Sequence, residues 1–82
     1  MAKLLKSNGE ILQNVDISTL KKMQDLVGGL IEFVYLKDNQ GLLVANEEGL
    51  LNDLPHNQKA SSIYGRPLVG DVIQCGLAEV NL

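Results

Sequence analysis

Hydrophobic and polar residues alternate in short blocks along the chain, and each block predicts one element of secondary structure. The first block, KLLKSNGEILQNVDI at residues 3–17, predicts two short strands joined by a turn. The turn falls at Ser7-Asn8-Gly9, because Asn-Gly tolerates the positive φ values that a tight hairpin requires. The chain is therefore expected to open with a β-hairpin.

An amphipathic helix is predicted next, over about residues 19–27. Its sequence, STLKKMQDLVGG, carries apolar residues at helical spacing: Leu20, Met23 and Val27, with Leu26 broadening the stripe. Ser18 is the expected N-cap, and Gly28 offers the left-handed conformation in which many helices end.

The central part of the chain predicts two further strands. LIEFVYL, residues 30–36, is rich in β-branched and aromatic residues. DNQG, residues 38–41, is expected to reverse the chain into a returning strand, LLVA. NEEG then forms another turn, with Asn46 and Gly49 in its special backbone positions.

The last third of the chain predicts a short helix and a closing strand. The helix is expected over residues 58–64, with Asn57 as its N-cap and Gly65 at its end. PLVGDVIQC follows as the closing strand, with a bulge or bend at Gly70-Asp71.

These elements follow the order β-β-α-β-β-α-β, which is typical of the α+β class. We expect a single domain over residues 1–82. It should contain a small, mostly antiparallel sheet of about four or five strands, one main helix and one short helix.

Glu32 is the one charged residue within the apolar run VGGLIEFVYL. With a period of two it shares a strand face with Leu30, Val34 and Leu36, so both faces of this strand are apolar. We therefore expect a central strand that is covered on both sides, by a helix and by another subunit. Glu32 either lies near the end or edge of the strand, in water, or pairs with a base or a ligand hydroxyl, because an unpaired buried carboxylate is too costly.

Composition narrows the classes of partner. The net charge is −3, whereas duplex binding relies on clustered Lys and Arg. The tight basic pair Lys21-Lys22 fits the solvated face of a helix, so we expect no duplex nucleic acid as a partner.

The longest apolar runs fall far short of the ~20 residues that span a bilayer, and the amino-terminal run is too short for a signal peptide. We expect no membrane partner and a cytoplasmic location, which is the host cytoplasm if the protein is phage-encoded.

His56 and Cys75 are the only histidine and cysteine in the chain. They are too few for a structural zinc site, and no Ser-His-Asp ordering rises above chance. We therefore expect a non-enzyme, without catalytic residues, metal or cofactor.

A lone cysteine also rules out a disulfide within the chain. Short chains without a disulfide are often stabilised by a partner subunit, so we expect a homo-oligomer.

The segment NQKASSIYGR, residues 57–66, is the strongest candidate for a binding element. Asn57 and the first amides of the helix face one way, and anions favour helix N-termini. Lys59 and Arg66 bracket the segment, and Tyr64 offers a ring for stacking. The alternative is a capped amphipathic helix with ordinary surface bases.

Three segments of the chain resemble a family of small bacterial and phage proteins, catalogued as domain of unknown function number 3846. They are LVGGLIEFVYL, NEEGLLNDLPHNQKAS and GRPLVGDVIQCG. The resemblance extends over nearly the whole chain, and its four motifs, VGG-x-IE, EEG-L, LP-x-N-x-x-A and V-G-D-V, occur here in order. These motifs are typical of a fold more than of a set of catalytic residues.

The resemblance implies a phage or mobile-element context, where small non-enzymatic proteins often counter host defence. One hypothesis is a homo-oligomer that binds and sequesters a nucleotide-derived host immune signal. Its ligand-binding residues would be Lys59, Arg66 and the amides after Asn57 for phosphate, Tyr64 for stacking, and Glu32 for ribose hydroxyls or a base edge. The alternative is a protein-interaction module that inhibits a host restriction or defence protein through an exposed strand or the second helix.

Overall fold

A computed structural model describes residues 2–37 and 40–80. They form one five-stranded sheet in the order β2-β1-β5-β4-β3, in which every neighbouring pair is antiparallel. The strands are β1 (Lys3–Leu5), β2 (Ile11–Gln13), β3 (Ile31–Tyr35), β4 (Leu42–Asn46) and β5 (Val72–Cys75); the helices are α1 (Leu20–Val27), α2 (Gln58–Tyr64) and the 3-10 helix η2 (Leu77–Glu79). The predicted α+β class and order of elements are confirmed. The predicted reversal lies partly outside the described residues, at 38–39.

The amino-terminal hairpin forms where the sequence predicts it. β1 and β2 pair antiparallel, with Leu4 opposite Leu12. Between them, the N–H of Gly9 donates to the carbonyl of Lys6 over 3.0 Å. Gly9 takes a φ of 99°, in the region that glycine adopts at no steric cost.

Helix α1 is capped by Thr19 and not by Ser18. The backbone of Thr19 is extended, with φ −134° and ψ 158°, and its hydroxyl oxygen accepts a hydrogen bond from the N–H of Lys22 over 3.1 Å. The N–H of Ser18 instead donates to the Asp16 carboxylate over 2.9 Å. The prediction for Ser18 is therefore wrong, because the helix begins at Leu20 and the N-cap position directly before it is held by Thr19.

Acid should weaken the fold through Asp16, which accepts hydrogen bonds from Lys22 Nζ over 2.7 Å and from the Ser18 N–H. These bonds, Lys22 first, hold the pKa of Asp16 well below its ordinary value of 3.8. A carboxyl group with a lower pKa in the folded state stabilises the fold above about pH 4, and this stabilisation is lost as the pH falls through the folded-state pKa. Asp16→Asn should therefore flatten the fall in melting temperature below about pH 4, as measured by circular dichroism. Parallel melting curves for both proteins across that range would contradict this expectation.

Helix α2 is anchored by Asn57, whose side chain has no exposed surface. Its Oδ1 accepts a hydrogen bond from the N–H of Ala60 over 3.0 Å, which confirms the predicted N-cap. Its Nδ2 donates to the carbonyls of Leu5 over 2.8 Å and Gly70 over 2.7 Å. One side chain thus ties α2 to the end of β1 and to the segment before β5.

Glycines end both helices and bend the closing segment, as predicted. Gly28 and Gly65 follow α1 and α2 with φ values of 83° and 86°, and Gly70 has a φ of 75°. The closing strand is shorter than predicted and begins at Val72. Before the bend, Val69 forms only an isolated bridge to His56.

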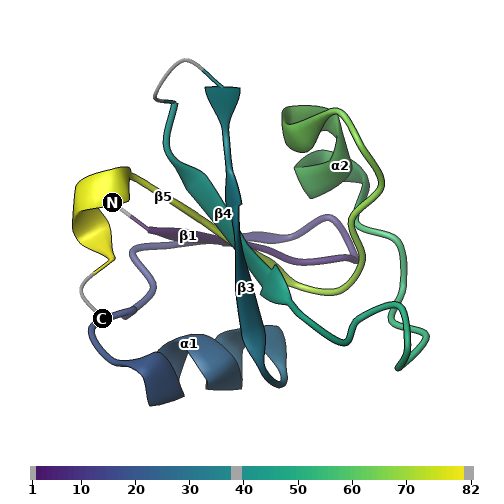
Figure 1. Cartoon of the computed structure of the whole chain (residues 1–82), viewed down its shortest axis with the longest axis horizontal. Helices are drawn as coiled ribbons and strands as arrows, with labels where there is room; N and C mark the ends of the chain where they lie inside the picture. Colours follow the sequence, from purple (N-terminus) through teal and green to yellow (C-terminus); the bar gives the residue numbers. More distant parts are fainter. Residues whose placement is uncertain (1, 38–39, 81–82) are drawn as a thin grey trace.

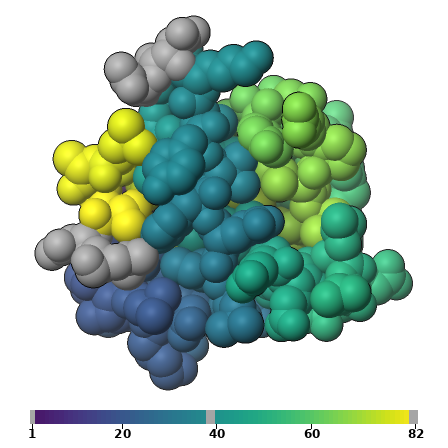
Figure 2. All heavy atoms as spheres, in the orientation of Figure 1, coloured from purple at the N-terminus to yellow at the C-terminus, as the bar shows by residue number. Residues whose placement is uncertain are grey.

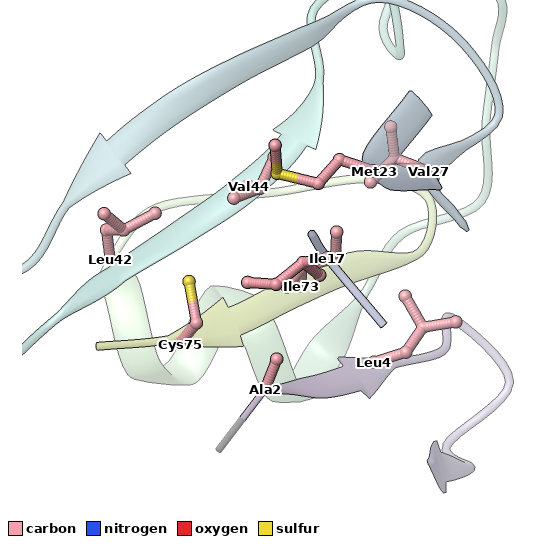
Figure 3. Close-up of a cluster of buried hydrophobic side chains, with 9 residues drawn as sticks. All are labelled: Ala2, Leu4, Ile17, Met23, Val27, Leu42, Val44, Ile73 and Cys75. Carbon is pink, nitrogen blue, oxygen red and sulfur yellow. The ribbon is translucent and has the colours of Figure 1, made fainter. Parts of the chain in front are cut away.

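Each face of the sheet carries an apolar cluster and one helix (Figure 1). Figure 3 shows the cluster on the α1 side: Ala2, Leu4, Ile17, Met23, Val27, Leu42, Val44, Ile73 and Cys75. The cluster on the α2 side consists of Leu5, Leu43, Ala45, Ala60 and Val72. Since successive residues of β4 alternate between the two clusters, β4 is the strand that is buried on both faces.

β3 lies at the edge of the sheet, beside β4. None of its residues is fully buried. The expectation that the run around Glu32 forms a central strand is therefore wrong. The apolar side chains on its two faces pack against the two clusters from outside, with Ile31 and Phe33 on the α1 side and Val34 on the α2 side.

Candidate binding site

A cavity of about 530 Å³ opens between the end of β3 and the end of α2. We call it the α2-end cavity. It is lined by Tyr35, Leu36, Lys37, Gln40, Ile63, Tyr64, Gly65 and Arg66. In Figure 2 the β3–β4 hairpin (teal) and α2 (green) adjoin on the face toward the viewer.

Ser61 holds the loop that carries Arg66. The N–H of Leu68 donates to Ser61 Oγ over 2.7 Å, and that hydroxyl donates to the carbonyl of Leu68 over 3.2 Å. The N–H of Gly65 donates to the carbonyl of Ser61 over 2.7 Å. Because both ends of this short loop are bonded to one residue of α2, Arg66 projects from a well-defined backbone.

Tyr64 provides the aromatic ring of the α2-end cavity. It is half-buried and packs against the cluster on the α2 side of the sheet. The ring of Tyr35 packs edge-on against Phe33, with 6.4 Å between ring centroids. Since Phe33 lies on the α1 side, Tyr35 borders the cavity at its rim, and Tyr64 is the ring placed to stack on a planar ligand.

Lys37 adds a second base that the sequence reasoning missed. It is exposed and lies two residues after the end of β3, where its carbonyl accepts from the N–H of Gln40 over 3.2 Å. Lys37 and Arg66 give the cavity two cationic side chains, and no carboxylate stands among its described lining residues. Two cationic side chains can attract an anion. The two bases are far apart in sequence, and they are brought to one cavity by the fold.

Glu32 lines a different cavity on the same side of the sheet, with a volume of about 420 Å³. We call it the Glu32 groove. Its lining residues are Glu32, Ala45, Asn46, Glu47, Leu50, Leu51, Pro67, Leu68 and Val69. Glu32 is exposed on an edge strand, so within one chain it lies where water reaches it. The structure therefore does not bring Glu32 together with Tyr64 and Arg66 in one cavity.

Asn57 and Lys59 lie outside the residues that line these two cavities. The buried amide of Asn57 is committed to three main-chain groups, and it occupies the N–H of Ala60. Lys59 is exposed in the first turn of α2, at the opposite end of the helix from Tyr64. Of the five residues predicted for the site, only Tyr64 and Arg66 share a cavity.

Neither Cys75 nor His56 is among the described residues that line the α2-end cavity. Cys75 belongs to the cluster on the α1 side of the sheet, and burial, with a smaller effect of the Glu79 charge, raises the pKa of its thiol to about 11. The thiol is therefore protonated at neutral pH, when it is a weak nucleophile. His56 is exposed in the segment before α2. Among residues 2–37 and 40–80, no group of three His, Cys, Asp or Glu side chains is arranged to hold a metal ion.

None of the helices in the described ranges has the length and apolar character required to cross a bilayer.

The fold and the site together define a small α+β domain with a basic, aromatic cavity at one end of a sheet edge. The chain belongs to the family of the domain of unknown function DUF3846, whose family model matches residues 1–81. The resemblance seen in the sequence motifs is thereby confirmed over almost the full length. Comparisons with curated proteins and with solved structures give no significant match.

Proposed function

We propose that this protein binds a nucleotide-type anion in the α2-end cavity and leaves it chemically unchanged. The observation that carries the proposal is that Tyr64, Lys37 and Arg66 line one cavity. A ring for stacking and two cations complement a ligand that joins a planar base to phosphate. The volume of about 530 Å³ lies within the range of small-molecule sites, ~300–1,000 Å³.

A non-catalytic binder acts by withholding its ligand from other receptors. We propose that the ligand is a nucleotide-derived immune signal of a host cell, and that the protein sequesters it in the host cytoplasm as a phage-encoded homo-oligomer. The phage context implied by the family resemblance supports this role. Cys75, which is not among the described residues that line this cavity, is buried and has a raised thiol pKa, so it is a weak nucleophile.

A stability screen identifies the ligand class. The parent protein is heated with cyclic mononucleotides, cyclic dinucleotides and nucleoside diphosphates, each in excess. A ligand that binds only the native state raises the melting temperature, by an amount equivalent to ~2.7 kcal/mol at a hundredfold excess over Kd. A protein that melts at the same temperature with every nucleotide would count against the proposal.

Arg66→Ala should lower the affinity for the selected nucleotide about ten- to a hundredfold, because it removes a charge-assisted phosphate contact worth ~1.5–3 kcal/mol. Lys59→Ala is the matched control. It deletes a base from the same helical segment but outside the cavity lining, so its affinity should stay within twofold of the parent. Calorimetric titration of the three proteins measures both values. Equal losses for both variants would point to general attraction of an anion by surface charge.

A second function, a protein-interaction module, is favoured by one specific observation. Leu50 and Leu51, which border the Glu32 groove, are 84% and 85% exposed. Neighbouring exposed leucines beside an open strand edge are typical of a surface that docks a protein. If the nucleotide screen fails, Leu50→Ser together with Leu51→Ser tests this function by the loss of binding to a host restriction or defence protein.

A further inference from the structure

The outer edge of β3 presents a row of main-chain groups to solvent. The carbonyl of Leu30 accepts from the N–H of Glu47, and the N–H of Leu36 donates to the carbonyl of Gly41. Because bonding to a neighbouring antiparallel strand alternates residue by residue, the even-numbered residues of β3 face β4. The N–H and C=O groups of the odd-numbered residues, 31, 33 and 35, therefore point away from the sheet.

The side chains along this edge are apolar and only partly covered. Ile31, Phe33 and Val34 are half-buried, and Tyr35 is 65% exposed. Edge strands are usually protected by charged residues, proline or short length. β3 has five residues and a single charge, Glu32. The opposite edge of the sheet, β2, is protected by its length of three residues.

We propose that β3 pairs antiparallel with β3 of a second copy of this chain, around a two-fold axis at Phe33. In this register Phe33 faces its own counterpart, and Ile31 faces Tyr35 of the second copy. All the outward-facing main-chain groups of β3 then gain partners, and the two sheets become one continuous sheet. On the α1 side, the side chains of Ile31, Phe33 and Tyr35 then meet across the axis.

The sequence of β3 selects this register among the symmetric ones. An axis at Glu32 places two carboxylates directly opposite each other, which is destabilising. An axis at Val34 leaves the main chain of Ile31 beyond the end of the facing strand. With the axis at Phe33, Glu32 lies opposite Val34 of the second copy, and no two like charges are directly opposed.

This pairing also brings Glu32 toward the α2-end cavity, a step that rests on the proposed function. Glu32 of the second copy lies opposite Val34, on the α2 side of the sheet. Leu36, which lines the cavity, is two residues further on the same face, or ~7 Å along the strand. The second copy thus brings a carboxylate to the side of the sheet on which Leu36 lines the α2-end cavity, as an acceptor for ligand hydroxyls.

Two substitutions of Val34 test the register. In the dimer, residue 34 of each copy lies opposite Glu32 of the other copy, so each substitution changes two pairs. Val34→Lys creates two attractive pairs, and Val34→Glu creates two repulsive ones. Both place one charge at the same half-buried position, so each controls for the effect of the other on the folded monomer. Analytical ultracentrifugation should give the Glu variant a dimer dissociation constant at least about tenfold above that of the Lys variant. Equal constants would overturn the proposed register.

Amide hydrogen exchange of the unsubstituted protein tests the pairing without any variant. At micromolar concentration the amides of residues 31, 33 and 35 should be protected, and dilution should release them together. A monomer at that concentration, or a dimer in which these amides exchange freely, would overturn the proposal. Neither measurement uses a nucleotide, so failure of the dimer is distinguished from failure of the binding function, which Arg66→Ala tests.

Glu32→Gln should lower nucleotide affinity about tenfold in a dimer that persists. Unchanged affinity would remove Glu32 from the site.

Discussion

Asn57→Ala should destabilise this protein more than any other single side-chain truncation considered for it, by about 3–5 kcal/mol. The substitution leaves the carbonyls of Leu5 and Gly70 and the N–H of Ala60 without their buried partner. Each such group costs ~1–3 kcal/mol when it is buried and unsatisfied. For a chain of this size, the melting temperature should fall by roughly 20 °C, as measured by calorimetry or circular dichroism.

Thr19→Ala is the matched control, because it removes an N-cap of the same kind from α1. The Thr19 hydroxyl satisfies only the exposed N–H of Lys22, so its loss should cost ~1 kcal/mol. The difference between the two variants then measures what Asn57 contributes by tying α2 to β1 and to the segment before β5. Similar losses for both would show that Asn57 acts as a cap alone.

Gly41→Ala should also be severely destabilising, by ~3 kcal/mol. Gly41 has a φ of 101°, and a Cβ there would lie 2.5 Å from the carbonyl oxygen of Cys75. That oxygen belongs to the main chain of the neighbouring strand β5, so it cannot move aside as a side chain can. The substitution therefore adds a steric clash between strands to the strain of a left-handed alanine. Urea unfolding of the variant and the parent measures the loss.

Gly9→Ala separates these two effects. Gly9 has nearly the same φ, 99°, but nothing lies within 4 Å of a Cβ built on it. It should therefore lose only the ~1–2 kcal/mol of backbone strain. If Gly9→Ala and Gly41→Ala were equally destabilised, the close approach of residue 41 to β5 would contribute nothing.

The elements that could be predicted from the sequence are those fixed by neighbouring residues. The cap of α2 and the glycines that end both helices depend on a few contiguous positions, and they were predicted correctly. The position of β3 could not be predicted in this way. A strand with apolar residues on both faces can be the buried centre of a sheet or an edge that packs against two clusters from outside. In this fold β4 is an interior strand buried on both faces, and β3 is the edge strand beside it.

The candidate site depends on the fold in the same way. Tyr64 and Arg66 line one cavity, and the sequence grouped them because they lie together at the end of one helix. Lys37 was missed, because it lines the same cavity as these two residues only in the folded chain. Asn57 was singled out as a ligand contact, yet its amide faces the interior, where long-range partners occupy it. Hydrogen-bond partners that are distant in the chain cannot be predicted from the residues around Asn57.

Nucleotide binding in the α2-end cavity can be followed residue by residue, by titrating the isotope-labelled protein with a cyclic dinucleotide and recording backbone amide resonances by NMR. Binding in this cavity should give saturable shifts that are largest at Lys37, Tyr64 and Arg66, with one common dissociation constant. Resonances that stay unmoved at these three residues, or that shift only around Leu50 and Leu51 in the Glu32 groove, would contradict it.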